Sequence, residues 1–372
     1  MRFTFSQVSM MKGLQRVMGA IATRVPMPSL SNLQMKLEGK KLEITATDLD
    51  TTITAQVELI DAEGSGGVLV QAKRFQELIR ELPDVPLEVN VPEDGKVLLG
   101  GEGVGNYILP GGDPVEFPEL PAVDAKVTFT IKAEDIRRMV SKTIFAVSND
   151  EMRPVLTGIL LQVRSEEMRM VATDGHRLSK IIHRNIGYSG EPIDVIVPMK
   201  ALNLVMRNLQ DDDEPEIALA ESRASFTTKS QRLVTRLIDG HYPRYESVIP
   251  EANPGRMNLR TSDLMSAVRR VSIFASQISR QIRLKIDTTS IRLESEDQEL
   301  GGKADELVSV SYDAEPMEIA YNAAYLMDVL KQIDTEDAVF EMGADDDAAI
   351  VKPTTQEENE EFIMLLMPIR LK

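Results

Sequence analysis

The chain repeats one pattern three times along its length. A short alternating strand, a polar helix start and an amphipathic helix follow one another at residues 3–21, 129–147 and 257–275. A strand and a turn around an acid come next, at residues 47–49, 173–175 and 296–298. An apolar strand that runs into a second helix recurs at residues 68–82, 195–209 and 317–333. Each unit ends on an apolar strand near Leu109, Ile238 and Met367. Landmarks that recur in this order predict three copies of one fold.

These repeats predict three α+β domains, with boundaries at residues 1–122, 123–252 and 253–372. A chain of 372 residues is too long for one ordinary hydrophobic core, which agrees with several domains. Each domain is expected to pack two helices on antiparallel sheets, because strands such as 41–47 and 168–173 alternate and require one buried face. The Pro-containing stretches 114–121 and 250–254 are predicted linkers, since proline cannot continue a strand ladder.

The first helix of each unit is amphipathic. In the first unit the residues at helical spacing predict a buried stripe of Val8, Met11, Leu14, Val17, Met18 and Ile21. In the second unit Ile136, Met139, Val140, Thr143 and Ile144 are expected to point inward. The faces opposite these stripes carry cations, so the helices are predicted to present a basic outer side.

Charge is divided between helices and loops. A formal net charge of -17 argues at first against a nucleic-acid partner, because Lys and Arg supply most of the affinity for phosphates. The acids gather in loops, at residues 211–214, 345–347 and 357–361. The cations expected on helix faces are Lys12, Arg16, Lys73, Arg74, Arg80, Arg138, Lys142, Lys200, Arg207, Arg269, Arg270 and Lys331. Any one of them would be ordinary on a solvated helix, but the pattern over six helices favours sequence-independent contact with a phosphate backbone.

Sequence motifs for catalysis and metal binding are missing. The chain has no cysteine, which excludes disulfides, thiol nucleophiles and zinc-thiolate sites. Its histidines, at 176, 183 and 241, have no metal-ligand spacing. The cluster Asp174-Gly175-His176-Arg177 resembles a catalytic site because it brings together an acid, an imidazole and a guanidinium. An Asp followed by a Gly is, however, typical of a tight turn. We therefore expect no enzyme, cofactor or metal.

The apolar stretches are all shorter than the roughly 20 residues that cross a bilayer, and residues 1–6 lack the apolar core of a secretory signal. A cytoplasmic protein without a membrane partner is expected.

Two short motifs carry a family resemblance. Residues 172–178 (ATDGHRL) together with residues 366–371 (LMPIRL) resemble the bacterial DNA polymerase III β subunit, the replicative sliding clamp. Residues 153–158 (RPVLTG), residues 239–243 (DGHYP) and the threefold repeat agree, so the resemblance covers the entire chain. It implies three sliding-clamp domains per chain and a head-to-tail homodimer of six domains. Such a ring encircles duplex DNA, with helices around the hole and sheets outside.

The resemblance also implies the partners. The ring would tether the DNA polymerase III α subunit, the clamp loader and other proteins that carry Gln-x-x-Leu-Phe motifs. Their peptides would bind a pocket between the second and third domains, where an apolar wall buries a Leu-Phe pair. Matched residue by residue, this wall comprises Leu156, Thr173, Gly175, His176, Arg177, Leu178, Pro243, Val248, Leu365, Met367, Pro368, Ile369, Arg370 and Leu371.

Further implied residues concern DNA and the dimer seam. Arg24 matches a family position that touches DNA. Tyr107 and Leu109 of one chain would meet Ile273 and Phe274 of the other.

Some positions depart from the family pattern. Pro154 and Val155 stand where aromatic DNA-contacting side chains occur, and Ser247 stands where an Arg can edge the pocket. These departures bear on the DNA path and on the polar rim of the pocket.

Two rival hypotheses remain: a monomeric repeat-built scaffold without a DNA role, and an enzyme that uses Asp174, His176 and Arg177.

Overall fold

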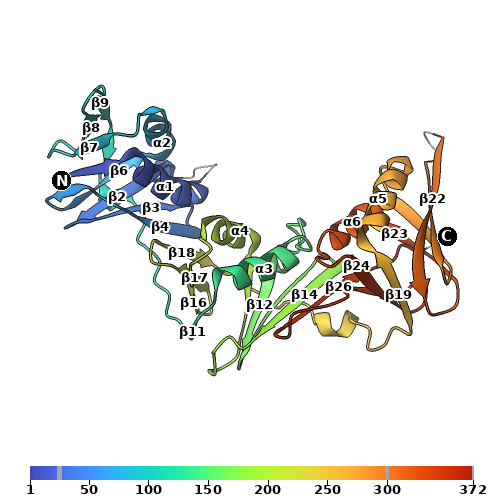
Figure 1. The fold of residues 1–372 in the computed structure, drawn as a ribbon. Coiled ribbons are helices and arrows are strands. Elements are labelled where there is room, and N and C mark those ends of the chain that lie inside the picture. Colours follow the sequence, from blue (N-terminus) through green and yellow to red (C-terminus); the bar gives the residue numbers. More distant parts are fainter. Residues whose placement is uncertain (23–26, 298–300, 371–372) are drawn as a thin grey trace. The chain divides into compact units, whose positions relative to one another are not determined.

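The structure is a computed structural model that describes residues 1–22, 27–297 and 301–370 (Figure 1). The chain folds into two compact units. Unit 1 comprises Met1–Ile136 and Lys200–Leu237, and unit 2 comprises Arg137–Met199 and Ile238–Lys372. The second repeat therefore contributes to both units.

Unit 1 contains two antiparallel sheets. The five-stranded sheet has the order β5-β1-β7-β8-β9, and the nine-stranded sheet has the order β10-β6-β2-β3-β4-β18-β17-β16-β11. The strands are β1 (Arg2–Ser6), β2 (Asn32–Glu38), β3 (Lys41–Thr47), β4 (Thr51–Val57), β5 (Asp61–Glu63), β6 (Gly66–Gln71), β7 (Pro86–Asn90), β8 (Val97–Gly101), β9 (Tyr107–Leu109), β10 (Gly111–Gly112), β11 (Val127–Thr130), β16 (Glu216–Leu219), β17 (Arg223–Thr227) and β18 (Gln231–Arg236). Its helices are α1 (Gln7–Val17), α2 (Ala72–Glu81) and most of α4 (Met199–Asn208).

Unit 2 contains one twelve-stranded antiparallel sheet, with the order β15-β12-β13-β14-β26-β25-β24-β19-β22-β21-β20-β23. Its strands are β12 (Gly158–Arg164), β13 (Glu167–Thr173), β14 (Arg177–Arg184), β15 (Ile193–Pro198), β19 (Gly255–Arg260), β20 (Gln281–Ile286), β21 (Ser290–Asp297), β22 (Gly302–Tyr312), β23 (Met317–Asn322), β24 (Asp337–Met342), β25 (Ala349–Pro353) and β26 (Glu360–Leu366). Its helices are most of α3 (Ala133–Ile144), α5 (Thr261–Val271) and α6 (Ala323–Leu330). Neither these helices nor those of unit 1, over the residues described, are long and apolar enough to cross a membrane.

The repeated order of elements is confirmed. A strand is followed by a helix at β1-α1, β11-α3 and β19-α5, and again at β6-α2, β15-α4 and β23-α6; only β11 and α3 are separated, by residues 131–132. The predicted strands 41–47 and 168–173 match β3 and β13. The closing strands end slightly early, because Ile238 forms only an isolated bridge with Ile196 and Met367 follows the end of β26.

The buried stripe of α1 differs from the prediction. Met10, Gly13, Leu14 and Val17 are buried, whereas Val8 is 43% exposed. The helix begins directly at the end of β1, with Ser6 as its N-cap, so the inward face is turned by one residue. Gly13 lies at the point of closest approach, where an added Cβ would lie 2.7 Å from Cγ2 of Val57 on β4. A small residue at this place draws the helix onto the sheet and leaves Met11 beside the contact rather than at its centre.

Consecutive repeats are joined in the same way twice. Strand β4 of the first repeat pairs with β18 of the second, with Ile53 opposite Leu233. Strand β14 of the second repeat pairs with β26 of the third, with Ile181 opposite Phe362. Both junctions are antiparallel ladders that continue one sheet across two repeats, so each pair of neighbouring repeats shares a buried apolar layer.

Candidate peptide site, basic helix surfaces and seam residues

A tight turn between β13 and β14 holds the predicted Asp174 cluster. The Asp174 carboxylate accepts hydrogen bonds from the backbone N–H groups of His176 at 2.9 Å and Arg177 at 3.0 Å. Gly175 has a φ of +90°, which favours glycine because it has no Cβ. The carboxylate is therefore engaged in closing the turn, as the tight-turn interpretation predicts. The first repeat builds the same turn around Asp48, with Leu49 at a φ of 82° in place of the glycine.

Arg177 is buried beneath this turn. Its guanidinium carbon lies 4.7 Å from the Tyr325 ring centroid and 5.3 Å from that of Phe145, a geometry in which aromatic faces attract a cation. It also donates to Asp174 at 3.2 Å and to Asp328 at 2.7 Å. Burial would raise the pKa of Asp328, but hydrogen bonds from Lys331 and Arg177 outweigh it, so this pKa is lowered. Arg177 thus ties the second repeat to helix α6 of the third.

His176 is exposed on the outer side of the same turn, and its ring stacks on Tyr325 at a centroid distance of 5.6 Å. Tyr325 therefore contacts two of the predicted site residues, although it is not among the predicted residues itself. The available signal was its place in the first turn of α6, where its backbone N–H donates to the N-cap Asn322.

The C-terminal segment crosses from one repeat to the other. The N–H of Met367 donates to the carbonyl of His176 at 2.9 Å, and that of Ile369 donates to Ala320 on β23 at 2.7 Å. Met367 is 38% exposed, Pro368 and Ile369 are half-buried, and Arg370 is exposed. Ile369 and Arg370 also line a polar cavity of about 690 Å³ with residues of β20, β21 and β22. Leu371 lies outside the described residues.

The predicted wall divides into a surface and a support. Exposed or half-buried members are Thr173, Gly175, His176, Pro243, Val248, Met367, Pro368, Ile369 and Arg370. Leu156, Arg177, Leu178 and Leu365 are buried and lie beneath these members. Leu178 and Leu365 belong to an apolar cluster with Tyr245, and Tyr242 packs against it. The hydroxyl of Tyr242 accepts a hydrogen bond from the N–H of Thr173 at 3.0 Å, and burial raises its pKa.

The departures from the family pattern lie in two short 3-10 helices, η4 (Pro154–Leu156) and η5 (Tyr245–Val248). Pro154 is exposed and Val155 packs at the edge of the apolar cluster. The Ser247 hydroxyl donates to the carbonyl of Arg244 at 2.7 Å. Ser247 therefore closes its own short helical turn instead of offering a cation to the surface.

The predicted DNA-facing cations differ in how they are engaged. Over the residues described, Lys12, Arg16, Lys73 and Arg269 have no acidic side chain within 4 Å. Others pair with acids or donate to a carbonyl: Arg80 with Glu81, Lys200 with Asp48, Arg270 with Glu306, Lys331 with Asp328, and Arg207 with the carbonyl of Gln15. Arg24 lies outside the described residues.

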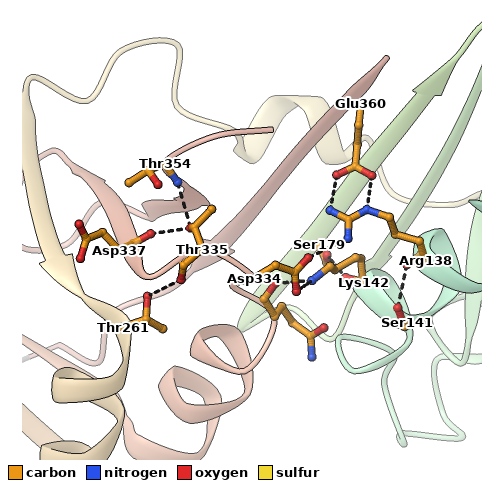
Figure 2. Close-up of polar contacts among 11 residues, drawn as sticks. Arg138, Ser141, Lys142, Ser179, Thr261, Asp334, Thr335, Asp337, Thr354 and Glu360 are labelled. Carbon is orange, nitrogen blue, oxygen red and sulfur yellow. Dashed lines mark hydrogen bonds and ion pairs between the residues drawn. The ribbon is translucent and has the colours of Figure 1, made fainter. Parts of the chain in front are cut away.

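Two of these predictions need correction. Lys142 is 5% exposed rather than outward-facing, and its ammonium donates to the carbonyl of Gln332 and to Asp334. Arg138 forms a bidentate pair with Glu360 and also donates to Asp334. Figure 2 shows both cations reaching from α3 to acids of the third repeat. Arg138 and Lys142 are therefore engaged by the next repeat, which a pattern of periodicity within one repeat does not reveal.

The predicted seam residues also fall into two classes. Ile273 is 76% exposed and Phe274 is 40% exposed, both in the short 3-10 helix η6 (Ser272–Phe274) after α5. On β9, Leu109 is only 6% exposed, whereas its neighbour Ile108 is 67% exposed. Leu109 and Ile108 therefore point to opposite faces of the strand, and Ile108 is the one that faces outward.

Metal-binding clusters of three or more His, Cys, Asp or Glu side chains do not occur in the described part of the chain.

Comparisons with known proteins agree along the whole chain. Sequence profiles for the N-terminal, central and C-terminal domains of the DNA polymerase III beta subunit match residues 1–121, 130–244 and 246–370. The beta sliding clamp of Pseudomonas aeruginosa is 31% identical over 373 residues and covers 100% of both chains. That of Escherichia coli K12 is 29% identical over 338 residues, which covers 90% of this chain and 91% of the relative.

Solved structures show the same relationship. A sliding clamp from Pseudomonas aeruginosa, bound to griselimycin, superimposes with a TM-score of 0.95 at 30% identity and covers 100% of both chains. The sliding clamp of Bacillus subtilis has a TM-score of 0.94 at 24% identity over 100% of both chains, which shows the fold alone. The resemblance in the two short motifs is thereby confirmed, and the chain belongs to the DNA polymerase III beta subunit family, the sliding clamps of DNA replication.

Proposed function

We propose that two copies of this chain close head to tail into a ring around duplex DNA and tether the replicative polymerase, the clamp loader and other proteins through the peptide site. Family membership carries the coarser statement: the protein is a processivity factor of DNA replication and not an enzyme. We further propose domains at 1–122, 123–252 and 253–372, and a cytoplasmic location. The ranges of the three family profiles support this division.

The observation that carries the ring is the way in which repeats join. Strand β4 of the first repeat pairs with β18, the last strand of the second repeat. Strand β14 of the second repeat pairs with β26, the last strand of the third. The corresponding strand of the third repeat is β22, whose residues 302–309 pair only with β21 among the described strands. In the first repeat, β9 is the edge strand of its sheet. An exposed strand edge is a template for pairing with another chain, and β22 of one copy with β9 of a second satisfies both edges.

Equivalent residues support the same seam. Gly19, Phe145 and Ile273 occupy the same place in the three repeats, sixteen residues after the starts at 3, 129 and 257. Gly19 packs against Leu204 of the second repeat, and Phe145 lies against Arg177, which reaches the third. Ile273 is left 76% exposed. A large apolar residue exposed at the position that lies at the junction with the next repeat in the other two units supports burial against a second copy.

Sequence-independent contact with DNA fits the cations that lack acidic partners. Lys12 and Arg16 of α1, Lys73 of α2 and Arg269 of α5 are available to phosphates, whereas the acids gather in loops. A ring holds DNA by topology, so weak and salt-dependent contacts suffice to keep a tethered polymerase at high effective concentration.

Peptide binding fits the surface around Met367. Met367, Pro368 and Ile369 expose apolar surface, and Met367 is hydrogen-bonded to the backbone of the exposed His176. A methionine adapts its shape to different partners, and the backbone of this segment is fixed by hydrogen bonds to both repeats.

Retention on circular and linear DNA tests the proposal. After loading, the protein should stay on a closed circle in high salt and slide off once the circle is cut, because only topology holds it. Ile273→Asp should sediment as a monomer of about 41 kDa and lose retention, whereas Val115→Asp, at a residue 85% exposed on the first repeat, should change neither. Equal loss from circular and linear DNA would support the monomeric scaffold instead.

A further inference from the structure

We propose that one face of helix α3 is a positioning device for the peptide site, and that Lys142 is its central positioning residue. This inference rests on the proposed peptide binding. The face consists of Arg138, Lys142 and the residue just beyond the helix end, Phe145. These positions follow the spacing i, i+4 and i+7, so they lie one above another on a single side of the helix.

Each position contacts a different level of the β14–β26 ladder. Arg138 grips Glu360, which stands opposite His183 at one end of the ladder. Lys142 lies midway, with its ammonium 5.4 Å from the Phe362 ring centroid. Phe145 lies against Arg177, which stands opposite Leu366 at the peptide-site end. The three side chains therefore follow the ladder, with Arg138 and Lys142 in contact with the third repeat and Phe145 in contact with Arg177 of the second.

The third repeat is built to receive these cations. Lys142 donates to the Gln332 carbonyl at 2.5 Å and to Asp334 at 2.6 Å, both in the segment after α6. Asp334 also accepts from Arg138 at 2.7 Å (Figure 2). The side chains of Lys142 and Glu360 are 6% and 3% exposed. A buried charge persists only where it is paired and hydrogen-bonded, so these contacts define one relative position of the two repeats.

A hydrogen bond to the main chain of Lys142 connects α3 to the strands that lead to the peptide site. The carbonyl of Lys142 accepts a hydrogen bond from the buried hydroxyl of Ser179 at 2.5 Å. Ser179 is two residues from Arg177 and stands opposite Met364 on β26. The turn with His176 and the segment with Met367 begin at this end of the same two strands, and they share a direct hydrogen bond. A shift of α3 therefore changes the spacing between the two sides of the peptide site.

The competing role is direct contact with DNA. Lys142 is buried and has committed its ammonium to Gln332 and Asp334, so it has little capacity left for a phosphate. The two roles differ in their readouts: a phosphate contact changes the salt dependence of DNA retention, whereas a positioning residue changes peptide affinity.

The test uses the full-length protein and a fluorescein-labelled peptide that contains Gln-x-x-Leu-Phe. Lys142→Met keeps the length of the side chain and removes its charge, and it should weaken binding by about tenfold in fluorescence anisotropy. Lys142→Arg should restore most of the affinity. Asp334→Asn, at an exposed carboxylate, is a milder second variant should Lys142→Met fail to fold. The matched control is Lys352→Met, which removes a half-buried lysine paired with Glu341 inside the third repeat.

Hydrogen exchange gives a readout that does not need the peptide. Backbone amides of Ser179, Ile181 and Met367 should exchange about tenfold faster in Lys142→Met and at the normal rate in Lys352→Met. Unchanged peptide affinity together with unchanged exchange would overturn the positioning role, as would an altered salt dependence of DNA retention with normal peptide binding. If the wild-type protein does not bind the peptide, the proposed function fails, and the exchange comparison still decides whether Lys142 fixes the two repeats.

Discussion

Replacing Gly19 by Ala tests how the first two repeats are packed together. Gly19 lies in the 3-10 helix η1 (Met18–Ala20) after α1, and a Cβ at this position would lie 2.2 Å from Cδ2 of Leu204 on α4. Carbon atoms attract at about 3.5–4.0 Å, so the overlap is roughly 1.3–1.8 Å. Leu204 is 7% exposed and has little room to turn aside. Overpacking of this kind costs about 1–3 kcal/mol, less about 0.4–1 kcal/mol because alanine restricts the unfolded chain.

The decisive comparison is a double-mutant cycle. Leu204→Ala alone should cost about 2–5 kcal/mol, because it leaves a cavity. In that background the new methyl group of Gly19→Ala enters the vacated space, so the second substitution should be neutral or stabilising by about 0.5 kcal/mol. The free energy of unfolding would be measured by urea titration, and a coupling of about 1–3 kcal/mol, equal to the relieved overpacking, is expected. Equal costs of Gly19→Ala in both backgrounds would show that the close approach does not determine stability at this junction.

Three further outcomes are expected. Gly175→Ala forces a side chain into a φ of +90°, so it should lower the free energy of unfolding by about 1–2 kcal/mol in a urea titration and weaken peptide binding. Gly187→Ala, at a φ of +66° in an open loop, should carry a similar strain but leave peptide affinity unchanged. Asp334→Asn should destabilise by less than about 1 kcal/mol, because the carboxylate is half exposed. Burial would raise the pKa of Asp334, but hydrogen bonds from Lys142 and Arg138 outweigh it and lower the pKa. The stabilisation from this carboxylate is therefore complete above the unfolded pKa of about 3.9. The difference in free energy of unfolding between Asp334→Asn and the wild type should close as the pH falls below that value. Lys12→Ala should reduce the salt dependence of DNA association by about one phosphate contact, and an unchanged slope would show that Lys12 does not contact DNA.

Much of the fold could be predicted from residue patterns within one repeat. The strand-to-helix order and the turn around Asp174 follow from local periodicity and from the preference of Asp and Gly for turns. These features depend on neighbours a few residues away, so the sequence carries them directly. The buried stripe of α1 was misplaced because a strand fixes the helix start, and Gly13 rather than a large residue marks the line of closest contact.

The residues whose surroundings could not be predicted lie at contacts between repeats. Arg138 and Lys142 lie opposite the apolar stripe of α3, so a pattern confined to one repeat places them in solvent. Their acids, Asp334 and Glu360, are about two hundred positions further along the chain. Tyr325 was missed for the same reason, because it meets His176 and Arg177 only after the third repeat has packed on the second. Periodicity does not encode partners that tertiary packing supplies.

One place in the repeat, thirteen residues after each start, shows how copies of a fold acquire different junctions. At Arg16 the backbone carbonyl accepts from Asn208 of the second repeat, and at Lys142 the side chain reaches Gln332 of the third. At Arg270 the side chain pairs with Glu306 of its own repeat and stays exposed. The first two contacts join parts of one chain, so they need not offset the loss of translational freedom that two separate molecules incur on association. The proposed seam between two copies, on the repeat that carries Arg270, must offset that loss, so the fraction of paired chains depends on protein concentration. Dilution should therefore separate two copies while the β14–β26 ladder stays folded, which sedimentation combined with hydrogen exchange at Ile181 would detect.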